Sequence, residues 1–439
     1  MAQKKPFNQF LLILLILLMV VCGTINSCGQ KIMMKMESKG DKFEQHKFII
    51  CSLMFIGELF SLCPYFIKYY AKKKKNDNTS KIDKALGKED NIDRDLTEEE
   101  KETEEEKETE EDEEKKKKEA PFYIFSITAM CDLVASTLGT FALIFLATSI
   151  YQIFRALELM FVLIFSKVFL KNPIYRHHVL GIGTLILGLF LVGLSSILFQ
   201  GEASTHPIRG ISILCFSQIV SATQYTLQEY FLKKYTFNPF KLVGFEGFFG
   251  ISIYSILLTI FQHINCENWG SLKVVCFERK GVSILLENTT FAFQQIFNRT
   301  SLTILVFIYI TSIAAYNIIG INLTKLVSST ARAIVDTTRT FLIWIVFLTP
   351  FAPKEAKEHF NFLQLTGFIL TVTGMIIYNE IIEISLFDLN YYTRKEIAKR
   401  ESLTEQIEEI EKNKKDKTND NTQGLFDNSN LDNETGGDN

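Results

Sequence analysis

Three ionisable side chains lie inside an otherwise apolar stretch of the chain. Residues 329–348, STARAIVDTTRTFLIWIVFL, carry Arg332, Asp336 and Arg339. The spacings of four and three place all three on one stripe of a helix. A charged side chain at the centre of a bilayer costs about 2.5–3.5 kcal/mol or more, so such residues usually face a protein interior or a watery cavity. Asp336 can pair with either arginine, which leaves one positive charge over. The triplet predicts a substrate site; the alternative is a purely structural ion-pair network.

A second apolar segment carries a related pair of charges. Residues 151–170, YQIFRALELMFVLIFSKVFL, contain Arg155 and Glu158, which are three apart and can pair on one helix. Arginine suits bidentate contact with a carboxylate or a phosphate. Both residues are therefore predicted to bind substrate. Arg155 begins its predicted helix, however, and could instead extend its side chain to the membrane surface.

Four further polar residues lie in apolar stretches. Asp132 and Asn317 are added to the predicted substrate site, whereas Glu58 and Glu246, each beside a glycine, are predicted to orient the substrate or to carry protons. The alternative for the two glutamates is that each hydrogen-bonds a neighbouring backbone and holds packing.

These residues must be positioned by membrane helices. Of the 439 residues 47% are hydrophobic, and the charges concentrate in residues 72–119 and in the C-terminal tail. Runs of about 20 apolar residues can cross a bilayer. The sequence contains ten such runs, at approximately 7–28, 48–70, 121–146, 149–170, 178–199, 209–232, 240–262, 301–324, 327–349 and 362–384. We therefore expect an all-α membrane protein with ten transmembrane helices and no cleaved signal peptide.

The connections divide the chain into seven parts. Residues 72–120 form a charged low-complexity loop, residues 263–300 a second long loop, and residues 386–439 a polar tail. The predicted helices occupy the parts between them, which are residues 1–71 (helices 1 and 2), 121–200 (helices 3 to 5), 201–262 (helices 6 and 7) and 301–385 (helices 8 to 10).

The placement of lysine and arginine predicts the orientation. With both termini in the cytosol, most basic clusters that flank the helices also lie there. The loop 263–300 is then lumenal, so Asn288 and Asn298 are glycosylation acceptors, and Cys266 and Cys276 could form a disulfide. The first loop opposes this orientation, because it places five lysines on the lumenal side: Lys31, Lys35, Lys39, Lys42 and Lys47.

The two halves of the chain resemble each other. Residues 151–170 and 329–348 both place Arg-Ala near a helix start with an acid shortly after. Each is followed by a helix with two glycines seven apart, Gly181 with Gly188 and Gly367 with Gly374, where a neighbouring helix can approach closely. Five helices is an odd number, so the two copies must be inverted in the membrane. Inverted repeats are typical of secondary transporters.

Other classes of protein receive little support. The chain has no HExxH, GxSxG or P-loop motif, so no enzyme and no cofactor is expected. The histidines are scattered apart from His177 and His178 in a short basic loop, so no metal site is expected either. No nucleic-acid binding is expected, because the basic runs flank membrane helices.

Several motifs together resemble a known family. They are CGTIN, FIGE, CDL, YQIFR, TQYTLQEYF, NPFKLVGFEGFFG and NIIGINLTKLVSSTARAIVDTTRTFLIW, and they follow in order through the apolar region. The chain resembles the drug/metabolite transporter superfamily, and within it solute carrier family 35, subfamily F. The resemblance implies a ten-helix inverted-repeat carrier of endomembranes, lysosomal or Golgi-type, whose relatives move nucleotide sugars, other metabolites or drugs. Ala156 departs from the glycine that relatives tend to have, and Glu158 is additional.

The combined hypothesis is a secondary transporter that works by alternating access. Its expected partners are the lipid bilayer and a small polar metabolite, with an anionic one favoured by the leftover positive charge; a homodimer is left open. The alternative is a non-transporting membrane scaffold with a carrier fold, suggested by the charged loop and the tail. An ion channel is a weaker third possibility, since no glutamate ring or filter-like loop is visible.

Overall fold

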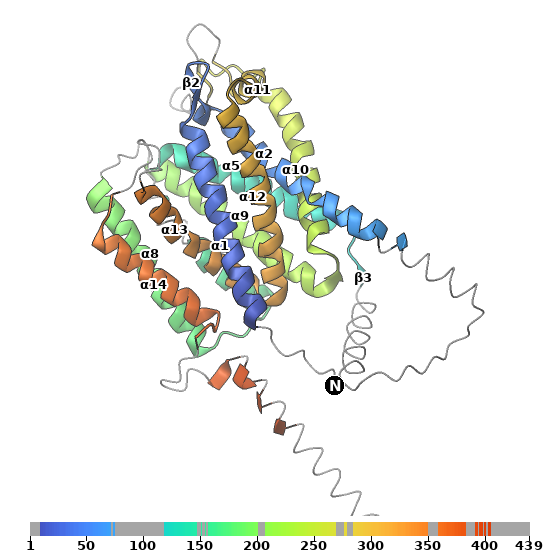
Figure 1. Ribbon diagram of the computed structural model, residues 1–439, viewed down its shortest axis with the longest axis vertical. Coiled ribbons are helices and arrows are strands. Elements are labelled where there is room, and N and C mark those ends of the chain that lie inside the picture. The colour runs from blue at the N-terminus through green and yellow to red at the C-terminus, as the bar shows by residue number, and fades with distance from the viewer. Residues whose placement is uncertain are drawn as a thin grey trace, which may run out of the picture.

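The protein is a bundle of long helices (Figure 1). The computed structural model describes residues 9–71, 73–74, 118–146, 151, 154, 157–200, 207–268, 276–278, 284–349, 359–382, 391–393, 395–397, 399–400 and 403–404. Its elements are α1 (Gln9–Lys35), β1 (Glu37–Ser38), β2 (Asp41–Lys42), η1 (Phe43–Gln45), α2 (Lys47–Phe60), β3 (Lys118–Glu119), α5 (Tyr123–Phe145), α7 (Leu157–Phe169), α8 (Arg176–Gln200), α9 (Pro207–Lys234), β4 (Tyr235–Thr236), α10 (Pro239–Phe261), α11 (Thr289–Asn298), α12 (Thr300–Leu326), α13 (Ser329–Leu348) and α14 (Phe362–Tyr378). Most of the predicted 72–120 loop and of the tail lies outside the described residues.

Six of the described helices are long and apolar enough to cross a membrane: α1, α2 with its continuation to Ala71, α5, α8, α10 and α12. Four more helices lie where the sequence predicts spans. The described part of α7 has 13 residues, α14 has 17, α13 carries three charges, and α9 contains several amide side chains. An all-α membrane protein is therefore confirmed, while the number of ten spans remains a prediction.

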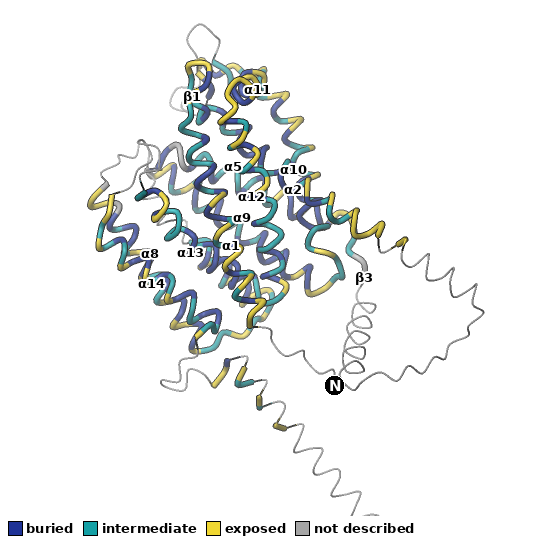
Figure 2. Tube along the Cα trace, in the orientation of Figure 1, coloured by how far each residue is buried: buried dark blue, intermediate teal, exposed yellow. Residues whose placement is uncertain are grey.

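The helices pack around a shared apolar core. One cluster joins buried residues of α1, α7, α8, α9, α12, α13 and α14, including Met19, Leu185 and Val335. Large apolar side chains such as Leu17 of α1 and Phe190 of α8 are exposed on the outside, and Figure 2 shows exposed positions along both helices. In a membrane protein this outer apolar surface would contact lipid.

Helices α8 and α14 approach each other through their glycines. A Cβ atom added to Gly188 would lie 2.5 Å from the carbonyl oxygen of Gly367, and one added to Gly181 would lie 2.9 Å from that of Gly374. The two glycine pairs thus face each other in opposite order, so the helices run antiparallel with their backbones in contact. The glycine spacing predicted a close helix approach, and the structure shows it. The glycines of α8 contact those of α14.

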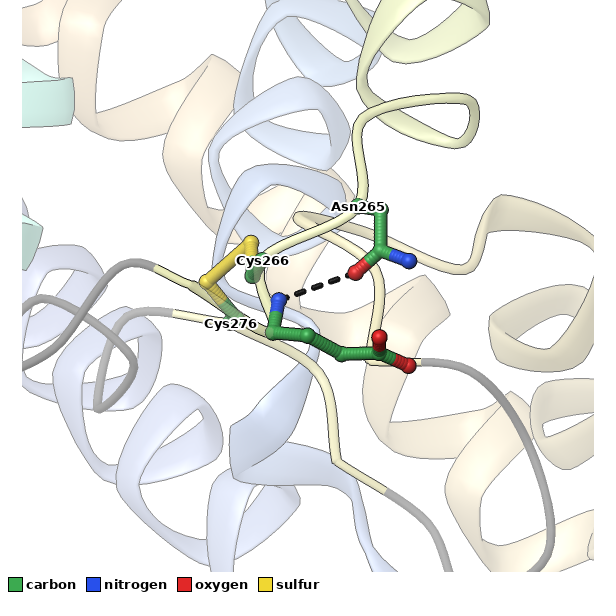
Figure 3. Close-up of a disulfide and its surroundings, with 4 residues drawn as sticks. Asn265, Cys266 and Cys276 are labelled. Carbon is green, nitrogen blue, oxygen red and sulfur yellow. Dashed lines mark hydrogen bonds between the residues drawn. A yellow bond between two sulfur atoms is a disulfide. The ribbon is translucent and has the colours of Figure 1, made fainter.

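A compact cap closes one end of the bundle. It consists of the hairpin β1–β2, the helix α11 and the segment around a disulfide between Cys266 and Cys276. Figure 3 shows this disulfide beside Asn265, whose side-chain oxygen accepts a hydrogen bond from the backbone of the following turn. Below it, the fully buried His46 and Glu287 form a hydrogen bond of 2.6 Å. The described part of the predicted lumenal loop is therefore tied to the start of α2.

We predict that the α8–α14 contact tolerates no added methyl group. Gly188→Ala would force the two backbones apart and is expected to lower the free energy of unfolding by about 1–3 kcal/mol. Gly183→Ala is the matched control, because the same helix leaves open space around Gly183. Thermal unfolding of the detergent-purified variants measures the difference. Equal melting temperatures for the two variants would contradict this packing.

Candidate functional site

Helix α13 organises the polar centre of the molecule. Ser328 caps its start by accepting a hydrogen bond from the helix backbone, which fixes Arg332 just inside the helix. The helix packs against α1, α7, α9, α12 and α14. Its three charged residues are therefore buried, with only 3% of Arg332, 4% of Asp336 and 8% of Arg339 exposed. The charged stripe faces the interior of the bundle.

Arg332 is surrounded by uncharged polar and aromatic groups. Its guanidinium donates one hydrogen bond of 2.8 Å to Gln228 of α9 and a longer one of 3.5 Å to Asn317 of α12. The guanidinium carbon also lies 4.3 Å from the centre of the Tyr225 ring, a cation–π contact. Gly320 leaves room for the side chain, since a Cβ there would lie 2.6 Å from Nε. The positive charge is thus held by dipoles and a ring.

Two amide side chains connect Arg332 to two glutamates on other helices. Asn317 donates a hydrogen bond of 2.6 Å to Glu58 of α2, and Gln228 donates one of 2.8 Å to Glu246 of α10. The oxygen of each amide accepts a hydrogen bond from Arg332, and its NH₂ group donates one to a carboxylate. Both polar groups of each amide are therefore satisfied. We call these five residues the Arg332 network. The network joins five helices: α2, α9, α10, α12 and α13.

Asp132 of α5 lies beside this network. Its carboxylate accepts a hydrogen bond of 2.9 Å from Ser136 and interacts electrostatically with Glu58, Glu246 and Arg332. Asp132 is half-buried, whereas Glu58 and Glu246 are buried. Three carboxyl groups therefore lie near one guanidinium, which itself contacts the uncharged amides and the Tyr225 ring. If all were ionised, the group would carry a formal charge of −2, which a cation or protons could offset.

Arg339 and Asp336 form a separate ion pair one turn further along α13. Their closest atoms are 3.0 Å apart, and the hydroxyl of Tyr316 donates to the same carboxylate oxygen. The guanidinium carbon of Arg339 lies 4.9 Å from the centre of the Tyr316 ring, and Gly23 of α1 leaves space for the side chain. The sequence allowed Asp336 to pair with either arginine. The structure pairs it with Arg339, so Arg332 is the arginine whose guanidinium bonds to neutral groups.

Tyr225 stands between the two arginine sites. It interacts electrostatically with four charged groups, namely Arg332, Glu158, Asp336 and Arg339. Glu158 is half-buried on α7 and accepts a hydrogen bond of 2.5 Å from Ser221 of α9. Arg155 lies outside the described residues. The predicted substrate residues that the structure describes thus gather around the inner faces of α9, α12 and α13.

The two predicted glycosylation acceptors have different surroundings. Asn288 is half-buried, and its side-chain oxygen caps α11 by accepting a hydrogen bond of 3.0 Å from Phe291. Asn298 is the exposed last residue of the same helix. Asn298 is therefore the more accessible acceptor.

Three contributors to the polar centre were missed from the sequence: Gln228, Tyr225 and Tyr316. A signal for the first two was present, because the apolar run of α9 contains the unusually polar stretch TQYTLQ at residues 223–228. Amides inside a membrane helix require partners, which marks them as candidates for a buried network. Tyr316 gave no such signal, since tyrosine is common in apolar helices.

Comparisons with known proteins agree with this architecture. The rat solute carrier family 35 member F6 is 27% identical over 372 residues, which is 82% of this chain and 87% of that protein. The mouse protein of the same name is 32% identical over 259 residues, covering 58% of this chain and 66% of its own length. One protein of known crystal structure matches with a TM-score of 0.51 at 10% identity, covering 84% of this chain and 96% of its own, and shares the fold.

Together the apolar helices, the buried charges and these relatives define a membrane protein of a transporter family. The family model described as CRT-like, chloroquine-resistance transporter-like, matches residues 107–378. The chain belongs to this family, and the resemblance to solute carrier family 35, subfamily F, is confirmed.

We predict that the Arg332 network is energetically coupled. Gln228→Leu should lower the free energy of unfolding by about 1–3 kcal/mol, because it removes the hydrogen bonds that Gln228 makes with both Arg332 and Glu246. In a double-mutant cycle, adding Arg332→Met should cost less in the Gln228→Leu background than in the wild type. Unfolding in detergent micelles measures each corner of the cycle. Additivity within about 0.5 kcal/mol would contradict the coupling.

Proposed function

We propose that this protein is a secondary transporter that moves a small polar metabolite by alternating access between two inverted five-helix repeats. The first repeat comprises α1, α2, α5, α7 and α8, and the second comprises α9, α10, α12, α13 and α14. The single observation that carries the proposal is the Arg332 network, which collects ionisable groups from both repeats at the centre of the membrane region. Transporters built from repeats bind their substrates at such an interface.

The pattern of helix contacts supports the repeat. If the helices of the two halves correspond in order, α1 corresponds to α9, α2 to α10, α5 to α12, α7 to α13 and α8 to α14. Each contact between the halves must then recur between the two corresponding helices. The contact α1–α12 is matched by α5–α9, α1–α13 by α7–α9, and α2–α12 by α5–α10. The contacts α2–α10, α7–α13 and α8–α14 are their own partners and are also present. The opposed glycine pairs of α8 and α14 follow the same symmetry.

The substrate site that we propose contains both arginine centres. Arg332, Asp336, Arg339, Arg155, Glu158, Asp132 and Asn317 contact the substrate, and Glu58 and Glu246 orient it or carry protons. Among the described residues, Arg332 makes two hydrogen bonds of the five that a guanidinium can donate, and both go to neutral amides. An anionic group on the substrate would find its counter-charge there. The nearby carboxyl groups can bind and release protons. Protonation would reduce their negative charge as the site opens and closes.

The arrangement of the chain ends supports the proposed orientation. The side chain of Gln9, at the start of α1, donates a hydrogen bond of 3.4 Å to the backbone of Ile381, just beyond α14. The start of α1 and the end of α14 therefore lie on one side, which we propose to be cytosolic, and the cap with its disulfide lies at the other end (Figure 1). A disulfide is typical of an oxidising lumen. An endomembrane of lysosomal or Golgi type fits this orientation.

Transport is tested with purified protein in liposomes. A mixture of nucleotide sugars, organic acids, amino acids and phosphorylated metabolites is supplied outside, and mass spectrometry identifies what accumulates inside. We expect saturable uptake of at least one class. Arg332→Ala, Arg339→Ala and Asp336→Ala should lower its kcat/KM by about tenfold or more, because each removes a charged partner worth about 1.5–3 kcal/mol.

The control variant is Arg209→Ala, which removes an exposed arginine at the start of α9. It should transport like the wild type. Wild-type rates in correctly folded Arg332→Ala and Arg339→Ala proteins would refute the site. No uptake of any metabolite by the wild type would favour the alternative, a membrane scaffold that keeps a carrier fold without transporting.

A further inference from the structure

A second polar cluster lies outside the proposed transport site, where α8 begins and α14 ends. His177 and His178 occupy the first turn of α8, and Glu380 follows α14. The Nε2 atoms of His177 and His178 lie 3.1 Å and 3.8 Å from the same carboxylate oxygen of Glu380. The side chains are nearly buried, with 5%, 11% and 8% exposed. Residues 200 positions apart in the sequence thus converge on one point.

The backbone around Glu380 is shaped to bring its carboxylate there. Glu380 has a φ of +57°, in the left-handed region that favours glycine. The backbone N–H of Ile381 donates to the carbonyl of Ile376, and that of Glu380 donates to Ile377, which closes the end of α14. Glycine is the usual residue at such a helix end; here a glutamate takes the conformation, and its carboxylate lies 3.1 Å from Nε2 of His177.

The ordinary interpretation is a hydrogen bond between a histidine and a glutamate that ties two helix ends together. It accounts for His177, whose Nε2 is within hydrogen-bond length of Glu380, and Nδ1 of His178 accepts a hydrogen bond of 3.3 Å from the backbone N–H of Tyr175. Nε2 of His178 lies 3.8 Å from the same carboxylate oxygen, beyond hydrogen-bond length. In addition, Nδ1 of His177 is buried and has no hydrogen-bond partner among the described residues. The hydrogen bonds therefore tie the two helix ends together, and they also leave two imidazoles and a carboxylate gathered at one buried point.

The donor set suits a transition-metal ion. One ligand atom from each of His177, His178 and Glu380 lies within 4.8 Å of the others. Zinc binds histidine nitrogen and carboxylate oxygen at about 2.0–2.2 Å, so two tetrahedral ligands lie about 3.3–3.5 Å apart. The observed separations of 3.1 Å and 3.8 Å bracket that value. A small rotation of the side chains would therefore place an ion between them.

Aromatic rings enclose the cluster. The rings of His177 and His178 lie 4.1 Å apart, the Tyr378 ring lies 4.6 Å from His178, and Tyr175 stacks on Tyr392 of the C-terminal segment at 5.2 Å. Such packing limits the movement of the imidazoles and the access of water. Such a surround controls the access of solvent to a metal site, and three protein ligands leave one position of a four-coordinate ion for water or an added ligand.

We propose that His177, His178 and Glu380 bind a divalent transition-metal ion, with zinc as its probe, and so join the start of α8 to the end of α14. The bound ion would hold together one helix from each half of the molecule. This site is independent of the transport proposal, because it shares none of its residues.

Zinc binding to the full-length protein in detergent tests the site. After treatment with a chelator, calorimetric titration with zinc should give one site per chain that magnesium does not fill. His177→Ala, His178→Ala and Glu380→Gln should each weaken the affinity by about tenfold or more, since even outer-shell changes weaken metal sites by that amount. His263→Ala removes an exposed histidine elsewhere and should leave the affinity unchanged.

Cobalt provides a measurement that does not depend on any variant. Cobalt added to the wild type should give the intense visible absorption of a four-coordinate ion, and zinc should displace it. The absence of both zinc binding and this spectrum in the wild type would overturn the proposal. Zinc binding that survives unchanged in the three folded variants, or that His263→Ala abolishes, would overturn it as well.

Discussion

The burial of a single guanidinium determines how the centre of this protein is built. Arg332 lies on a helix inside the bundle, is 3% exposed and cannot lose its proton. The free-energy cost of removing this charge from water is offset by the dipoles of amide side chains rather than by a counter-ion in direct contact. Gln228 and Asn317 accept from it, and each passes the interaction to a glutamate on another helix. The carboxylates therefore share the charge without contacting the arginine directly.

The same constraint explains where the helices must come close. Long polar side chains need space between helices, and glycines provide it: Gly320 beside Arg332 and Gly23 beside Arg339. The α8–α14 pair uses glycines for the opposite purpose, since its backbones touch and leave no space. Glycine therefore makes room for side chains at the polar centre and allows close contact between backbones at the periphery. A bundle assembled in this way keeps its charges away from lipid while its two halves stay in contact at α8 and α14.

Much of this architecture could be predicted from the sequence. The apolar runs located the helices, and the stripe Arg332, Asp336 and Arg339 identified the buried face of α13. The hydrogen-bond partners could not be predicted. The periodicity of a helix shows which of its faces is buried, but it does not show which side chains of other helices contact that face. Gln228 lies on α9, which in the sequence is recognised only as one of the ten apolar runs.

The histidine cluster shows the same limit more sharply. His177 and His178 alone predict no metal site, because two adjacent histidines in a basic loop are insufficient. The third donor, Glu380, is brought to them by the antiparallel packing of α8 and α14. The spacing of the glycine pairs predicted that each helix has a close neighbour, but it did not identify that neighbour.

The central claim is that the Arg332 network faces water from each side of the membrane in turn. Asn317 belongs to this network and is half-buried. A direct test replaces it by cysteine in a protein whose free cysteines have been removed. A membrane-impermeant thiol reagent is applied to sealed vesicles from one side and then, in separate vesicles, from the other. The account predicts that Asn317→Cys is labelled from both sides. Labelling from neither side or from one side only, while a cysteine at the exposed Lys39 reacts normally, would contradict it.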